Sequence, residues 1–189
     1  KISDKLKKKT IKTTFINRLP FSKKIYKYYL PLMPLALRFI NLKKYNLVIS
    51  SESGPSKGFK KGNFVHVCYC HSPMRYIWDS KEEYFEKFNF FEKIISKILF
   101  PLLKKWDVRT SRNIDLILAN SNFVSNRIKQ FWNRQSIVVH PPINFNNYEI
   151  SKNLKNYYLI LSRQVPYKKI DIAINAFNSI DKELIIIGD

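Results

Sequence analysis

The chain has 189 residues, of which 45% are hydrophobic and 25% charged, so it can build a core and is not typical of a disordered protein. Its formal net charge of +20 predicts attraction to polyanions, such as nucleic acids, anionic membranes or phosphorylated substrates. No apolar run reaches the ~18 residues of a membrane span. Cys68 and Cys70 stand too close in one extended segment for an easy disulfide, which favours a reducing compartment.

The two ends of the sequence indicate a fragment. The chain begins at Lys1 rather than at a methionine, and it stops at Asp189, directly after an apolar run. A last strand with no following helix to cover it is an unfinished unit. We therefore expect a considerably longer protein, from which both ends are missing here.

The first part of the chain predicts alternating strands and helices. A lysine-rich start at 1–12 is interpreted as a solvated segment. The patterns then predict a short helix at 34–40 and two strands, at 45–51 and 63–70, joined by a loop rich in Gly and Pro. A long helical region at 81–106 is bent or divided at Pro101. A third strand at 116–119, a helix at 122–132 capped by Ser121 or Asn122, and a fourth strand at 137–140 follow.

The asparagine-rich stretch 143–156 has no apolar period and predicts a linker between two domains. The first domain spans residues 1–142. The second starts at residue 157 with a strand at 157–161, a helix at 170–180 and a strand at 184–187. Buried strands that alternate with helices predict an α/β fold with parallel sheets in both domains, and no internal repeat is visible.

The stretch 66–79, HVCYCHSPMRYIWD, joins a predicted strand to a cluster of polar and aromatic side chains. Alternation along the strand places His66, Cys68 and Cys70 on one face and His71 on the other. His71 then stands at the carboxyl end of the strand, the edge at which open parallel sheets bind ligands. The cysteines face away from it, so a tetrahedral metal site would need distant ligands, and we expect no metal.

The stretch 161–177, LSRQVPYKKIDIAINAF, gathers cations after a strand and before a helix. Arg163 follows the strand, and Lys168 and Lys169 precede the helix, whose N-terminus carries a partial positive charge. This combination suits a diphosphate. The alternative is that these cations are solvated loop residues.

Four motifs in this order resemble retaining glycosyltransferases of the GT4 family (group 1), in the branch of bacterial polysaccharide mannosyltransferases. They are the two stretches above, DLILANSNFVSNRI at 115–128 and VVHPPINF at 138–145, and the resemblance runs from about residue 30 to the end. It implies the GT-B architecture: two Rossmann-like domains facing across a cleft. Here the first domain would lack its start, and the second would be present only as its first β-α-β unit.

The resemblance also implies roles for individual residues. Arg163 and Lys168 correspond to the pair that holds the diphosphate of the donor, where cations stabilise the charge of the leaving group. His71 corresponds to the catalytic histidine beside the donor sugar. Sugar or acceptor contacts are implied for Ser72, Arg75, Tyr76, Asp79, Asn120 and Ser121.

The sequence departs from the family pattern in two ways. Ser72 stands where the family usually has threonine, and Lys169 where arginine is common, and both changes keep the hydroxyl or the charge. The glycine-rich loop of the first domain and the paired glutamates of the second are absent from these residues. We therefore expect the present chain to be inactive by itself.

The resemblance implies transfer of a sugar, mannose from GDP-mannose, with retention, onto a surface polysaccharide or a lipid-linked glycan. It implies a cytoplasmic enzyme without cofactor or metal, and we expect no nucleic-acid partner. Lysines beside apolar residues in 84–106 also suit peripheral contact with the anionic inner face of a membrane, unless this helix is core. Three alternatives stay open: a basic nucleic-acid-binding module, a nucleotide-sugar enzyme of the same fold that is not a transferase, and a scaffold without turnover.

Overall fold

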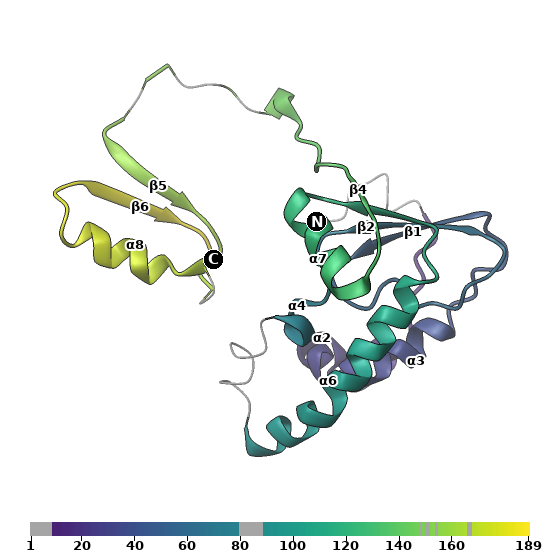
Figure 1. The fold of residues 1–189 in the computed structure, drawn as a ribbon. Coiled ribbons are helices and arrows are strands. Elements are labelled where there is room, and N and C mark those ends of the chain that lie inside the picture. The colour runs from purple at the N-terminus through teal and green to yellow at the C-terminus, as the bar shows by residue number, and fades with distance from the viewer. Residues whose placement is uncertain (1–8, 80–88, 148, 150–151, 154, 166–167) are drawn as a thin grey trace. The chain divides into compact units, whose positions relative to one another are not determined.

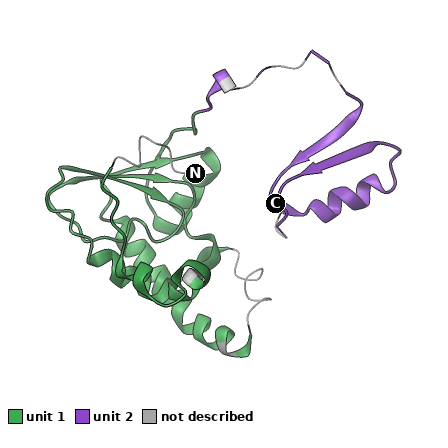
Figure 2. Ribbon diagram, turned by 180° about the vertical axis from the view of Figure 1, so that it is seen from behind, with its two compact units in different colours: residues 1–142 green, residues 143–189 purple. Residues whose placement is uncertain are grey.

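The computed structural model describes residues 9–79, 89–147, 149, 152–153, 155–165 and 168–189. The chain divides into two compact units, drawn in different colours in Figure 2: unit 1, residues 1–142, and unit 2, residues 143–189. Among the described residues, none of the helices combines the length and the apolar character needed to cross a bilayer.

Unit 1 is a mixed α/β unit with a four-stranded sheet. Its strands are β1 (Leu47–Glu52), β2 (Val65–Cys70), β3 (Leu116–Ala119) and β4 (Ile137–Val138). Its helices are α2 (Ser22–Ile25), α3 (Met33–Arg38), α4 (Arg75–Trp78), α6 (Phe90–Ser111) and α7 (Asn122–Trp132), with the 3-10 helices η1 (Phe15–Arg18) and η2 (Tyr26–Leu32).

The four strands follow one another in the order β1-β2-β3-β4, and each neighbouring pair is parallel. The prediction of an α/β unit with a parallel sheet is thus confirmed for unit 1, and this arrangement is compatible with a Rossmann-like fold. Because all four strands run the same way, their carboxyl ends meet at one edge of the sheet. This edge brings together residues that are distant in sequence.

One face of the sheet is buried. His66, Cys68 and Cys70 of β2 are fully buried, while the residues between them are more exposed, so the predicted alternation is confirmed. Ile128 and Trp132 of α7 pack in the same core cluster as the two cysteines. Figure 1 shows α3, α4 and α6 on one side of this sheet.

The opposite face of the sheet is apolar and exposed among the described residues. Five large side chains on it are exposed: Leu47, Ile49, Val65, Leu116 and Ile137. Side chains of these types fit a parallel sheet that is covered on both faces. The side chains on this face are thus of the types found in protein cores, but they are exposed to solvent in the described part of the chain.

Helix α6 differs from its prediction at both Pro101 and its end. It runs unbroken through Pro101 to Ser111, so, of the two predicted effects of this proline, the division is wrong and the bend stays a prediction. Phe100 and Leu103 are buried on either side of the proline, and this burial offsets the lost backbone hydrogen bond. The predicted start of the helical region, residues 81–88, lies outside the described residues.

A capping box fixes the start of α6. The side-chain oxygen of Asn89 accepts a hydrogen bond from the backbone N–H of Glu92 (2.9 Å), and the Glu92 carboxylate accepts one from the N–H of Asn89 (2.8 Å). The two bonds satisfy backbone donors that would otherwise be unpaired at a helix start. Glu92 is thereby committed to the cap.

Unit 2 is one strand–helix–strand unit, as predicted: β5 (Tyr157–Leu161), α8 (Ile170–Phe177) and β6 (Glu183–Ile187), preceded by η3 (Phe145–Asn147). The two strands are parallel, with Leu159 opposite Ile185. Helix α8 ends at Phe177, three residues before its predicted end. Gly188 follows β6 with φ of +158°, and a Cβ there would lie 1.8 Å from the carbonyl oxygen of Ser162, so only glycine fits.

Candidate functional site

The centre of the candidate site is His71, directly beyond the carboxyl end of β2. Its ring nitrogen Nε2 lies 2.9 Å from Oγ of Ser51, at the end of β1. Its backbone N–H donates to the carbonyl oxygen of Glu52 (2.7 Å), and its carbonyl oxygen accepts from Nδ2 of Asn120 (3.2 Å), just after β3. The ends of three strands thus fix an exposed histidine.

The tyrosine two residues before His71 restricts the ring further. The Tyr69 ring meets the imidazole edge-on, with ring centroids 5.1 Å apart. The Tyr69 hydroxyl donates to the carbonyl oxygen of Val139 (2.9 Å), beyond β4. The histidine ring is therefore held by a hydroxyl on one side and by an aromatic ring on another, while it remains exposed to solvent.

The N-terminus of α7 lies at the same edge. Ser121 caps this helix by accepting from the N–H of Val124 (3.3 Å), which confirms it as one of the two predicted caps. Its hydroxyl donates to Oδ1 of Asn120 (3.0 Å). Asn120 thus contacts both the cap and His71, so the predicted residues Asn120, Ser121 and His71 are brought together, beside a helix end that favours negative charge.

The loop after His71 is held by a buried arginine. Arg127 of α7 forms a two-point ion pair with the Asp79 carboxylate, and its side chain also lies 3.5 Å from the carbonyl oxygen of Pro73. Asp79 is committed to this pair, which ties the end of α4 to α7. Asp79 was predicted to contact the sugar or the acceptor, and the ion pair gives it an alternative role, which is to hold the loop in place.

The remaining predicted residues of this loop lie in α4 or just before it. The Ser72 hydroxyl donates to the carbonyl oxygen of Pro73 (2.8 Å), and the Tyr76 hydroxyl lies 2.9 Å from the sulfur of Met74. Arg75 is exposed at the start of α4.

A buried ion cluster lies behind the site. Lys57, which is fully buried, forms ion pairs with Glu52 at the end of β1 (3.2 Å) and with Asp107 of α6. The other Asp107 oxygen accepts from the indole N–H groups of Trp78 (2.8 Å) and Trp132 (2.7 Å). Two carboxylates and one ammonium therefore lie together in the protein interior, next to the rings of Trp78 and Trp132.

The charges in this cluster depend on one another. Burial by itself would lower the pKa of Lys57, but the carboxylates of Glu52 and Asp107 outweigh it, and the pKa lies above its ordinary value. Burial raises the pKa of Glu52, and the attraction of Lys57 only partly offsets this effect. Removing the cation would leave buried carboxylates without compensation.

The buried cluster also supports the site. Glu52 accepts from Lys57 with its carboxylate and from the N–H of His71 with its backbone carbonyl. Ser51, which contacts the His71 ring, is its neighbour in the chain. The ion cluster thereby fixes the end of β1 against which His71 is placed.

The two cysteines lie in the core and not in the site. Both are buried and free. Burial raises the pKa of the Cys68 thiol to about 11, and it raises the pKa of Cys70 further. Buried, protonated thiols are poor nucleophiles and poor metal ligands. Among the residues that the structure describes, no three or more His, Cys, Asp or Glu side chains are grouped to hold a metal ion.

His66 is a core histidine on the buried face of β2, and it makes stability depend on pH. Burial and the nearby Lys61 lower its pKa from 6.5 to about 4, so the folded protein resists protonation that the unfolded chain accepts. We expect the contribution of this histidine to lower the free energy of unfolding by about 3 kcal/mol as the pH drops from 6.5 to 4. Urea unfolding at several pH values measures this loss. The His66→Gln variant should lose less over the same range, and an equal loss in both proteins would contradict the assignment.

In unit 2, the predicted diphosphate residues follow β5. Arg163 and Lys168 are both exposed, and Lys169 precedes α8 in the left-handed conformation, with φ of 53°. The backbone N–H of Gln164 donates to the carbonyl oxygen of Asp189 (2.8 Å), which joins the segments that follow β5 and β6. Residues 166–167, between the two cations, lie outside the described residues.

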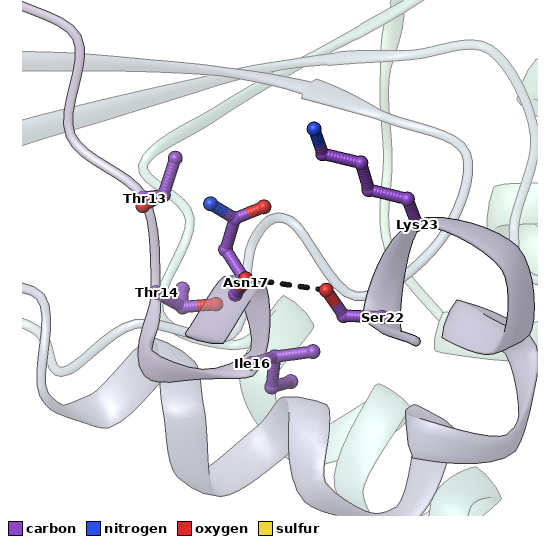
Figure 3. Close-up of a pocket in the computed structure, with 6 residues that line it drawn as sticks. All are labelled: Thr13, Thr14, Ile16, Asn17, Ser22 and Lys23. Carbon is purple, nitrogen blue, oxygen red and sulfur yellow. Dashed lines mark hydrogen bonds between the residues drawn. The ribbon is translucent and has the colours of Figure 1, made fainter. Parts of the chain in front are cut away.

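A hollow of about 330 Å³ lies at the start of unit 1 (Figure 3). It is lined by Thr13, Thr14, Ile16, Asn17, Ser22 and Lys23. The Ser22 hydroxyl donates to the carbonyl oxygen of Asn17 (3.2 Å), which joins two of its lining residues. None of the predicted site residues lines this hollow, so it is separate from the candidate site.

The sequence interpretation missed Ser51 and Lys57. Ser51 had a usable signal, because polar residues directly follow an apolar strand at SSES. Lys57 had none, since it is one of 34 cations in a loop rich in Gly and Pro. Neither the comparison with protein-family models nor the comparison with curated proteins gives a match for this chain.

Proposed function

We propose that the protein is a retaining glycosyltransferase of GT-B architecture that uses a nucleotide-sugar donor, with GDP-mannose as the first donor to test. The observation that carries this proposal is the exposed His71 at the carboxyl edge of a parallel sheet, where Ser51 contacts its ring and Asn120 donates to its backbone carbonyl. Ligands of open parallel sheets bind at this edge. The four motifs that resemble the GT4 family supply the choice of reaction.

The proposed step breaks the bond between the anomeric carbon of the sugar and the diphosphate oxygen. A hydroxyl oxygen of the acceptor forms the new bond to that carbon on the same face, and its proton is transferred to an oxygen of the departing diphosphate. Positive charge develops on the sugar ring and negative charge on the leaving group. His71 is assigned to the sugar, with Arg75 and Asn120 as neighbouring polar groups.

The exposed cations after β5 are assigned to the diphosphate. Arg163 and Lys168 present positive charge in the segment between β5 and α8. A guanidinium binds two phosphate oxygens with a planar pair of donors, while an ammonium acts as a point charge. Together they suit a leaving group whose negative charge grows during the reaction. The acceptor is proposed to be a surface polysaccharide or a lipid-linked glycan.

The Lys168→Ala variant of the full-length protein tests this assignment. Loss of a charge-assisted contact to phosphate is expected to weaken GDP-mannose binding by about 10- to 100-fold. Titration calorimetry with GDP-mannose and UDP-glucose measures the binding, and product analysis measures the turnover. Circular dichroism checks that the variant is folded.

The matched control is Lys182→Ala, an exposed lysine of unit 2 that precedes β6 and so lies towards the opposite end of the strands. It should bind donor as the wild type does. Equal binding by Lys168→Ala and the wild type would remove the diphosphate assignment. A full-length wild-type protein that turns over none of the nucleotide-sugar donors would refute the proposed function.

A further inference from the structure

One side of α6 carries an apolar row that faces solvent. Phe90, Ile94, Ile98 and Leu102 follow one another at intervals of four residues, and they are exposed by 73%, 45%, 67% and 58%. Residues four apart lie above one another on a helix, so the row is continuous over about 18 Å. Figures 1 and 2 both show the start of α6 extending beyond the neighbouring helices of unit 1.

The row is separate from the side of α6 that packs on the protein. Phe100 and Leu103 are buried against Met74 and Ile77, in a core cluster of their own. The helix therefore has two apolar sides, of which one forms core and the other meets solvent. Single exposed apolar residues are common on protein surfaces, but a continuous exposed row indicates an interaction surface.

Cations border the row and replace it towards the end of the helix. Lys93 and Lys97 are exposed within the first half of α6. Towards the end of the helix, a hollow of about 550 Å³ is lined by Lys104, Lys105, Val108 and Arg109 of α6, by Arg112 directly after it and by Trp78 of α4. No acidic side chain is among these lining residues.

The two acidic residues of α6 do not compensate these cations. Glu92 is committed to the capping box at the helix start. Asp107 is fully buried and pairs with Lys57. The solvent side of α6 therefore combines apolar side chains with positive charge. Such a side is complementary to a partner that has a negatively charged outer layer and an apolar layer directly under it.

We propose that this side of α6 docks on an anionic phospholipid bilayer. The apolar row enters the boundary between headgroups and acyl chains, and the cations of the hollow bind lipid phosphates. Amphipathic helices with basic borders bind membranes in this way, through buried apolar area together with attraction to anionic lipids. The proposal does not depend on the proposed sugar transfer, because it uses none of the residues assigned to that reaction.

Cosedimentation of the chain with vesicles tests the proposal. Vesicles of phosphatidylcholine with about one third phosphatidylglycerol should bind the protein, and vesicles of phosphatidylcholine alone should bind it at least about tenfold more weakly. Two variants should each lower binding to the anionic vesicles by about tenfold or more. One replaces Ile94, Ile98 and Leu102 with glutamine, and the other replaces Lys104, Lys105, Arg109 and Arg112 with glutamine.

A matched control removes four exposed lysines that lie outside α6, by Lys43→Gln, Lys44→Gln, Lys60→Gln and Lys129→Gln. It changes net charge as much as the cation variant and should keep most of the binding. A fluorescent label on Ile98→Cys should shift to the blue with anionic vesicles, while the same label on Lys129→Cys should not. The native cysteines are buried and do not compete for the label.

Three results would each overturn the proposal. The first is no binding to anionic vesicles. The second is an equal loss of binding in the cation variant and its matched control. The third is full vesicle binding by the glutamine variant of the apolar row together with displacement by polyuridylate, which would identify a general polyanion surface instead.

Discussion

Replacing Lys57 with methionine is expected to lower the free energy of unfolding of unit 1 by about 3–5 kcal/mol. Methionine keeps much of the length and the apolar stem of lysine, so the loss arises from the charge. The ammonium is fully buried between the carboxylates of Glu52 and Asp107. Without it, two carboxylates remain in the interior with no cation to compensate them. Urea unfolding followed by tryptophan emission measures the change.

Two further proteins make this expectation specific. Lys60→Met removes an exposed lysine three residues away and should change stability by less than about 0.5 kcal/mol. Combining Lys57→Met with Glu52→Gln and Asp107→Asn removes all three charges and should recover part of the loss, because no charge is left unpaired. A Lys57→Met protein as stable as Lys60→Met would show that the cluster contributes little.

Replacing His71 with alanine in the full-length protein is expected to lower kcat by about 100- to 1000-fold with little effect on folding. The ring is exposed, so its removal creates no cavity in the core. It lies at the carboxyl edge of the sheet, where the proposed sugar position is. Product formation from GDP-mannose measures the rate, and thermal unfolding measures the stability.

Ser51 and His140 provide the comparison for this variant. Ser51→Ala leaves the imidazole in place but removes the hydroxyl 2.9 Å from its ring, so it should lower kcat by about tenfold. His140→Ala removes another exposed histidine and should leave the rate unchanged. Turnover by His71→Ala close to that of the wild type would contradict the assignment of His71 to the reaction.

The sequence was sufficient for features that depend on local patterns. The alternation in β2 predicted which side chains share a face, because a period of two is a property of the strand itself. The same reasoning placed His71 beyond the end of this strand. Residue type and place before an apolar period narrowed the helix cap to Ser121 or Asn122, and Ser121 is the cap.

Features that depend on distant partners were not predictable in this way. Lys57 and Asp107 are 50 residues apart, and nothing near Lys57 in sequence distinguishes it from solvated lysines. Asp79 and Arg127 are 48 residues apart, so a carboxylate predicted for ligand contact is found in an ion pair. At Pro101, the local rule for proline was outweighed by core packing on both sides of it.

The aromatic surroundings of Lys57 give the protein an internal optical reporter. The chain has three tryptophans. Trp78 and Trp132 donate to Asp107, and the Trp106 ring lies 5.6 Å from the Lys57 ammonium. All of the intrinsic tryptophan emission therefore originates at the ion cluster, and water entering this cluster should shift the emission before unit 1 loses its sheet. Unit 2 has no tryptophan, so its unfolding is silent in tryptophan emission and can be followed by circular dichroism instead.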